Sequence, residues 1–79
     1  MTNFEKYQKV FCEVFEIEKD ILDNLEYQGI EQWDSMGHMS MISGLEDEFD
    51  IMFEMDDIID FSSFKKGIET LKKYDVDIS

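Results

Sequence analysis

Hydrophobic residues recur every three or four positions along much of this 79-residue chain, which is the spacing of one face of an α-helix. The first such run covers residues 3–15, and Thr2 followed by Glu5 has the spacing of a capping box at its start. The second covers residues 35–48. Its apolar stripe comprises Met36, Met39, Ile42, Leu45 and Phe49. Each run therefore predicts an amphipathic helix.

Two shorter runs follow the second helix. Residues 55–61 are apolar at three positions near their end, and residues 64–74 begin after Ser62 or Ser63, either of which can cap a helix. The pattern as a whole predicts an all-α fold of four helices at about 3–15, 35–48, 55–61 and 64–74, with a short third helix.

The stretch from Glu16 to Trp33 has no helical period. We expect a long first loop there, which could include a short helical turn between Ile17 and Leu25. A loop of this length inside a small domain is usually functional or held by its own side chains. Gly29 predicts a turn in which the glycine adopts a positive φ.

Composition limits the possible functions of the chain. Seven basic residues, all lysine, face 20 acidic ones, which gives a formal net charge of −13. Such a surface repels nucleic acid and attracts basic proteins. A hydrophobic content of 43% is too high for a disordered acidic tail. We expect a single domain over residues 1–79 that is monomeric.

Several features predict a cytoplasmic protein. Cys12 has no second cysteine to pair with, which suits a reducing compartment, and we expect it to be a partly buried structural thiol. No apolar run has the length of a membrane span, and the first residues lack the basic region of a signal peptide. We therefore expect no membrane association.

The start of the second helix carries the candidate chemistry. Asp34 is the natural N-cap, so Ser35 would expose its hydroxyl in the first turn, at the end of the helix dipole that favours anions. Gly37 in that turn should ease the close approach of a partner. A serine hydrolase is excluded, because Trp33 occupies the position where the nucleophile elbow requires glycine. His38, three residues after the serine, is expected to be a solvated residue or a partner contact.

No metal site is expected. Asp56, Asp57 and Asp60 form an acidic cluster, but they lack the glycine and glutamate that an EF-hand loop requires at its sixth and twelfth positions. Weak, nonspecific binding of divalent cations is the more natural interpretation.

The Asp34-Ser35-Met36 triplet, followed by the run from Leu45 to Ile51 (Leu-Glu-Asp-Glu-Phe-Asp-Ile), resembles the acyl carrier protein family. The resemblance implies a four-helix bundle with a long first loop and no catalytic activity of its own. It implies that a separate transferase attaches 4′-phosphopantetheine from coenzyme A to Ser35, with help from Asp34. The arm would carry acyl groups as thioesters, sheltered between the second and third helices.

The resemblance also implies partners. They would be a phosphopantetheinyl transferase and acyl-loading, elongating or acyl-transferring enzymes with basic docking patches. The expected partner-binding residues are Met36, His38, Met39, Met41, Glu46 and Asp47.

The chain departs from the family at two positions. Gly37 and Ser40 stand where the family commonly has acidic residues, which favours a specialised pathway over housekeeping fatty acid biosynthesis. Two alternatives stay open: an aminoacyl or D-alanyl carrier with the same arm, and an acidic helical adaptor whose serine is never modified.

Overall fold

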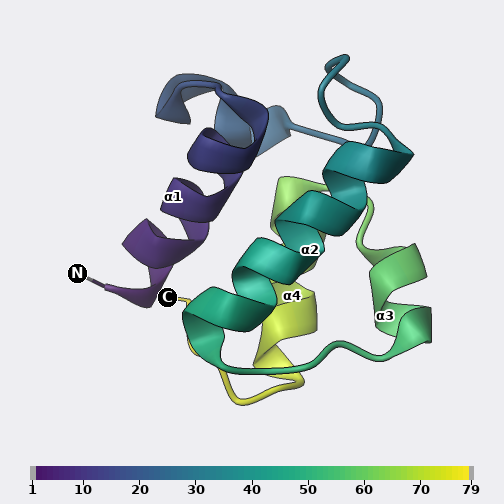
Figure 1. Ribbon diagram of the computed structural model, residues 1–79. Coiled ribbons are helices and arrows are strands. Elements are labelled where there is room, and N and C mark those ends of the chain that lie inside the picture. The colour runs from purple at the N-terminus through teal and green to yellow at the C-terminus, as the bar shows by residue number, and fades with distance from the viewer. Residues whose placement is uncertain (1, 79) are drawn as a thin grey trace.

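The computed structural model describes residues 2–78, which fold into helices connected by loops (Figure 1). The helical elements are α1 (Asn3–Phe15), the 3₁₀ helix η1 (Lys19–Asn24), α2 (Ser35–Phe49), α3 (Met55–Asp60) and α4 (Phe64–Lys72). Within the described residues there is no β-strand, and the only β-type pairing there is an isolated antiparallel bridge between Glu26 and Ser63. The all-α prediction is confirmed, and η1 lies where a short helical turn was predicted.

The helix ends follow from local hydrogen bonding. At the start of α1, Thr2 Oγ1 accepts a hydrogen bond from the Glu5 N–H at 3.1 Å, and Glu5 Oε1 accepts one from the Thr2 N–H at 3.0 Å, so the predicted capping box is present. At its end, Glu16 adopts a left-handed conformation with φ of 54°. The last helix, α4, ends at Lys72 rather than at the predicted Tyr74.

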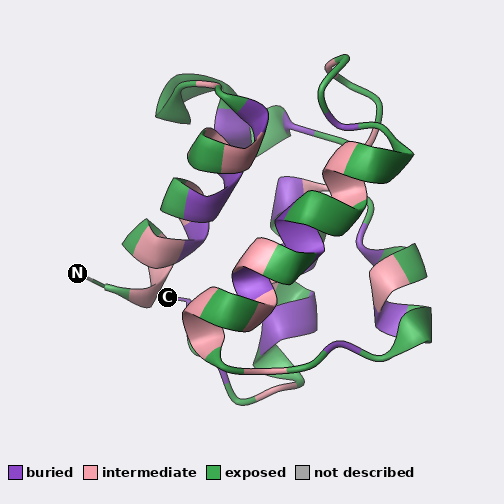
Figure 2. Cartoon of the chain, viewed as in Figure 1, coloured by how far each residue is buried: buried purple, intermediate pink, exposed green. Residues whose placement is uncertain are grey.

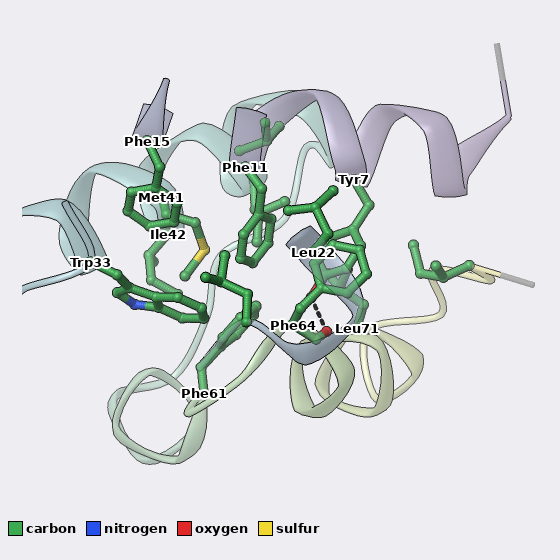
Figure 3. Packing of buried hydrophobic residues seen from close by; sticks show 14 of the residues in the cluster. Tyr7, Phe11, Phe15, Leu22, Trp33, Met41, Ile42, Phe61, Phe64 and Leu71 are labelled. Atoms are coloured by element: carbon green, nitrogen blue, oxygen red, sulfur yellow. Dashed lines mark hydrogen bonds between the residues drawn. The ribbon is translucent and has the colours of Figure 1, made fainter. Parts of the chain in front are cut away.

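An aromatic cluster forms the centre of the core (Figure 3). The ring of Phe11 lies with its centroid 5.0–6.2 Å from the rings of five other aromatic residues. These are Tyr7, Phe15, Trp33, Phe61 and Phe64. The Tyr7 hydroxyl donates to the Phe64 carbonyl at 2.5 Å, so even the polar atom of this buried tyrosine is satisfied.

The buried face of α2 differs from the predicted stripe. Met36 and Met39 are 81% and 53% exposed, whereas Met41, Ile42 and Leu45 are buried. Figure 2 shows buried and exposed positions alternating along α2. The predicted apolar stripe is therefore not the buried face of the helix, and Met36 and Met39 lie on its exposed side.

The two glycines of α2 explain this rotation. A Cβ at Gly44 would lie 3.0 Å from Val10 Cγ1 of α1, and a Cβ at Gly37 would lie 3.2 Å from Phe15 Cε1 and 1.9 Å from the Gln32 carbonyl oxygen. The helix thus turns its glycine side toward α1 and the loop, and this carries Met36 and Met39 outward. Gly37 was expected to ease the approach of a partner, but its free space is taken up by the protein itself.

The long first loop is held to the segment before α4 by two backbone hydrogen bonds on either side of Glu26. The Phe64 N–H donates to the Leu25 carbonyl, and the Tyr27 N–H donates to the Ser62 carbonyl, each at 2.9 Å. Positive φ occurs at Gln28 (66°) and not at Gly29, so the prediction for Gly29 is wrong. Gly29 is needed instead for close approach, because a Cβ there would lie 2.9 Å from the Glu26 carbonyl oxygen.

Candidate functional site

Ser35 is the first residue of α2, and its side chain is exposed. The cap is Asp34, whose Oδ1 accepts a hydrogen bond from the Gly37 N–H at 2.8 Å. Because the Asp34 carboxylate accepts the hydrogen bond from the first turn of the helix, the Ser35 hydroxyl is not needed as a cap. The structure therefore places Asp34 and Ser35 as the sequence predicted, with the hydroxyl accessible at the N-terminus of a 15-residue helix.

Tyr27 also belongs to this site, although no pattern in the sequence singles it out. Its hydroxyl and Ser35 Oγ share a hydrogen bond of 3.2 Å. Its ring lies edge-on to those of Trp33 and His38, with centroids 6.4 and 5.5 Å away. Tyr27 lies in a loop without hydrophobic periodicity, so only its hydrogen bond to Ser35 in the folded protein identifies it as part of the site.

His38 connects three elements. The Trp33 Nε1–H donates to His38 Nδ1 at 2.9 Å, and His38 Nε2 donates to the Ile58 carbonyl of α3 at 2.8 Å. A neutral ring with its proton on Nε2 satisfies both bonds. The expectation of a solvated histidine is wrong, because the ring is half-buried and both nitrogens are engaged within the chain. Neither nitrogen is left to accept a proton from Ser35.

A cleft of about 260 Å³ opens beside this site, between the start of α2 and α3. Tyr27 is part of its wall, so the cleft adjoins Ser35 through the hydrogen bond between the two hydroxyl groups. The lining residues are Tyr27, His38, Ile58, Ile59, Phe61 and Ser62. The exposed wall is mainly apolar, with hydroxyl groups at Tyr27 and Ser62 and an imidazole at His38.

The methionines near the site have separate roles. Met36 and Met39 project into solvent on α2 and remain candidates for contact with a partner. Met41, which was also expected to bind partners, is fully buried in the core. It is excluded from such a surface because a partner could reach it only by opening the packing between α1 and α2.

The two acidic residues near the C-terminal end of α2 that were predicted to bind partners differ in their surroundings. Glu46 is half-buried, and its Oε2 accepts a hydrogen bond from the Phe53 N–H at 2.9 Å, which fixes the chain as it leaves α2. Asp47 is exposed and free to face a partner. Of the two carboxylates predicted to bind partners, Glu46 thus has a structural role of its own.

A second polar connection anchors α3. The Tyr74 hydroxyl accepts from the Glu54 N–H at 2.9 Å and donates to Asp57 Oδ2 at 2.5 Å, while Lys73 Nζ donates to Asp57 Oδ1 at 3.0 Å. The bond from Tyr74, followed by that from Lys73, lowers the pKa of the Asp57 carboxyl. Burial, followed by the bond to Asp57, raises the pKa of Tyr74. Asp57, which was predicted only as part of an acidic cluster with weak, nonspecific affinity for divalent cations, therefore also connects α3 to the C-terminal segment.

Other chemical groups add little to the site. Cys12 is half-buried, as predicted, and burial raises the pKa of its thiol. Over residues 2–78, no three histidine, cysteine or carboxylate side chains converge in a way that could hold a metal ion. The same residues contain no helix with the length and apolar character needed to cross a membrane.

Comparison with models of known protein families finds no match for this chain. A comparison with curated proteins likewise finds none.

Proposed function

We propose that this chain is an acyl carrier protein, in which Ser35 receives a 4′-phosphopantetheine arm and the domain presents the attached acyl group to partner enzymes. The observation that carries the proposal is the position of the Ser35 hydroxyl. It is exposed, relieved of capping by Asp34, and hydrogen-bonded to Tyr27 at the edge of an apolar cleft. Modification of this oxygen disturbs no buried contact.

The residues of the site fit a phosphodiester. The N-terminal end of α2 carries a partial positive charge that stabilises a phosphate group. The Tyr27 hydroxyl, now shared with Ser35 Oγ, is placed to donate to an added oxygen. The arm would supply a terminal thiol that holds the acyl group as a thioester.

A separate transferase would catalyse the attachment of the arm. Ser35 Oγ forms a bond to the phosphorus that bears the pantetheine group of coenzyme A, and the pyrophosphate P–O bond to the nucleotide breaks. The leaving group is adenosine 3′,5′-bisphosphate, and the hydroxyl proton passes to a base of the transferase. The chain itself contributes the oxygen and the helix end that positions it.

The partners are expected to be basic proteins. A net charge of −13 steers such proteins toward the domain, mainly by raising the association rate. Both helices that border the cleft also expose apolar side chains, with Met36 81%, Met55 74% and Ile59 72% exposed. Flexible methionines suit a surface that contacts several enzymes in turn. A specialised pathway stays our preferred setting, because Gly37 and Ser40 replace acidic residues.

Intact-protein mass spectrometry tests the proposal. The chain is incubated with coenzyme A, magnesium and a broad-specificity phosphopantetheinyl transferase, and the wild type should gain the mass of one arm. Ser35→Ala should gain nothing and keep its helical circular dichroism, while Ser43→Ala, at an exposed position on the same helix, should be modified like the wild type. An unmodified wild-type protein would favour the helical adaptor instead. Loading by an amino-acid-activating enzyme in place of an acyl-activating one would identify an aminoacyl carrier.

A further inference from the structure

We propose that Tyr27 is the positioning residue of the attachment site: its hydroxyl orients Ser35 Oγ for transfer of the arm and then donates to the phosphodiester that forms. This inference rests on the proposed function, because it requires an arm on Ser35. It goes further by giving a residue of the first loop a part in the attachment step itself and in holding its product.

The Tyr27 side chain contacts α2 at two points on one side of the helix. Its hydroxyl oxygen lies 3.2 Å from Ser35 Oγ, and its ring lies edge-on to that of His38, with centroids 5.5 Å apart. Residues three positions apart are neighbours on a helix surface, so these contacts define how the tyrosine approaches α2. The His38 ring is itself fixed, because both of its nitrogens are hydrogen-bonded. The phenol ring is therefore held against a rigid neighbour while its hydroxyl meets the serine.

The backbone of Tyr27 is fixed as well. Its N–H donates to the Ser62 carbonyl at 2.9 Å. On its other side, the Gln28 N–H donates to the Trp33 carbonyl at 2.9 Å, with a positive φ of 66° at the glutamine. A left-handed conformation is unfavourable for a residue other than glycine, and here it closes the loop between Tyr27 and the start of α2. The loop thus holds Tyr27 beside Ser35.

The part of the chain that surrounds the site in sequence contains no lysine or arginine. Residues 20–64 include α2 and the loop before it, and neither residue type occurs among them. The Asp34 carboxylate, which accepts from the Gly37 N–H, would place a like charge next to a phosphodiester on the adjacent serine. This charge offsets part of the attraction that the helix N-terminus has for the anion. A neutral donor on the loop side, such as the Tyr27 hydroxyl, is therefore needed to hold the phosphate.

The hydrogen bond between the two hydroxyl groups changes character when the arm is attached. At 3.2 Å it is longer than the usual separation of about 2.7–2.8 Å between hydroxyl oxygens, so it holds the serine oxygen only loosely. The Ser35 proton passes to the base of the transferase, so afterwards only Tyr27 can donate. Its new acceptors include charged phosphate oxygens, and bonds to charged acceptors are roughly twice as strong as neutral ones. The tyrosine should therefore hold the phosphodiester more firmly than it holds the free serine.

The rate of attachment is the first test. Tyr27→Phe removes the hydroxyl and keeps the ring with its contacts to Trp33 and His38. With coenzyme A and a phosphopantetheinyl transferase, kcat should fall by about 3–10-fold while the KM for the carrier changes by less than about 2-fold, because alignment of the oxygen acts on the transfer step. Tyr7→Phe is the matched control. It removes a buried hydroxyl that bonds to Phe64, so it should lower the melting temperature and leave kcat unchanged.

The melting temperatures of four forms are the second test. They are the wild type and Tyr27→Phe, each with and without the arm. Attachment should raise the melting temperature by about 2–4 °C more in the wild type than in the variant, because only the wild type gains the bond to the phosphate and that bond lies at the surface. A tyrosine with a merely structural role would lower both forms of the variant equally. The phosphorus NMR resonance of the variant should match that of a short phosphopantetheinylated peptide, and the wild-type resonance should differ.

The possible failures can be told apart. An unchanged kcat in Tyr27→Phe, or a rise in KM alone, would overturn the role of Tyr27 in the transfer. An equal rise in melting temperature and an identical phosphorus resonance in both proteins would overturn its bond to the phosphodiester. If the variant lost its helical signal, a wild-type resonance equal to that of the peptide would still overturn this bond. All of these results require an arm on wild-type Ser35, so they differ from failure of the proposed function, in which the mass of the wild type never changes.

Discussion

Gly37→Ala should destabilise the protein, although alanine is the better helix former. Gly37 lies in the first turn of α2, where a Cβ would be 1.9 Å from the Gln32 carbonyl oxygen and 3.1 Å from its carbon. The obstacle is backbone and not the flexible end of a side chain, so the residues before α2 would have to move. Asp34 and Ser35 lie between Gln32 and Gly37, which makes the substitution a test of the site as well as of the fold.

The expected magnitude comes from two opposing terms. Replacing glycine with alanine inside a helix gains up to about 1 kcal/mol, and less in a first turn. Overpacking a filled space costs about 1–3 kcal/mol, so the net loss should be roughly 1–2 kcal/mol. For a domain of this size, each kcal/mol shifts the melting temperature by about 4–8 °C, which gives a decrease of roughly 5–15 °C.

Thermal melts followed by circular dichroism measure this decrease. Ser40→Ala serves as the control, because this residue is exposed on the same helix. Gly44→Ala should fall between the two, since its new Cβ would meet a valine methyl group at 3.0 Å, and a side chain can yield by a few tenths of an ångström. If Gly37→Ala melted at or above the wild-type temperature, the close contact between Gly37 and Gln32 would not constrain the protein. The same contact argues against an acidic replacement at position 37 as a way to imitate the housekeeping carriers.

Four further predictions concern other parts of the structure. Asp57→Asn should lower the melting temperature at neutral pH, and the difference should close in acid. Hydrogen bonds from Tyr74 and Lys73 hold the pKa of the folded Asp57 carboxyl below its ordinary value of 3.8. The stabilisation by Asp57 is therefore present above that value and is lost as the pH falls through the lowered pKa, so a constant difference into strong acid would contradict this. Tyr7→Phe removes the buried donor to Phe64 and should cost roughly 1–2 kcal/mol in urea unfolding, whereas a neutral result would show that the bond contributes nothing. Glu16→Gly should stabilise by roughly 0.5–1 kcal/mol, because Glu16 is left-handed with φ of 54°; Asp50→Gly, at the same φ, should gain less, since aspartate tolerates that region better. Added salt or millimolar magnesium should raise the melting temperature by screening the charge of −13, and indifference to both would mean that the charges are well dispersed.

The helix boundaries could be predicted from the sequence because they depend on local signals. Apolar spacing and the Thr2–Glu5 capping box defined α1, and Asp34 defined the start of α2. The rotation of α2 about its axis could not be predicted in the same way. The apolar spacing grouped Met36 and Met39 with Ile42 and Leu45 on one stripe. The close approach of Gly44 to Val10 of α1 decides instead which side of α2 faces inward.

The candidate site was predictable only in part for a similar reason. Ser35 and Asp34 are adjacent in the chain, and their arrangement follows from the rules of helix capping. The roles of Tyr27 and His38 depend on contacts between loop, α2 and α3 that no short-range pattern contains. Asp57 is similar, since its partner Tyr74 lies 17 residues away.

The stacked pair of Trp33 and His38 gives the protein an optical signal of its own. Trp33 is the only tryptophan in the chain, and its indole N–H is bonded to the imidazole that also holds α3. The two rings are nearly parallel, at 15°, with centroids 6.2 Å apart. Indole emission depends on what its N–H bonds to and on what lies against its face, so movement of α3 away from α2 would change the fluorescence of a single residue. Opening and closing of the cleft could thus be followed in real time without any label.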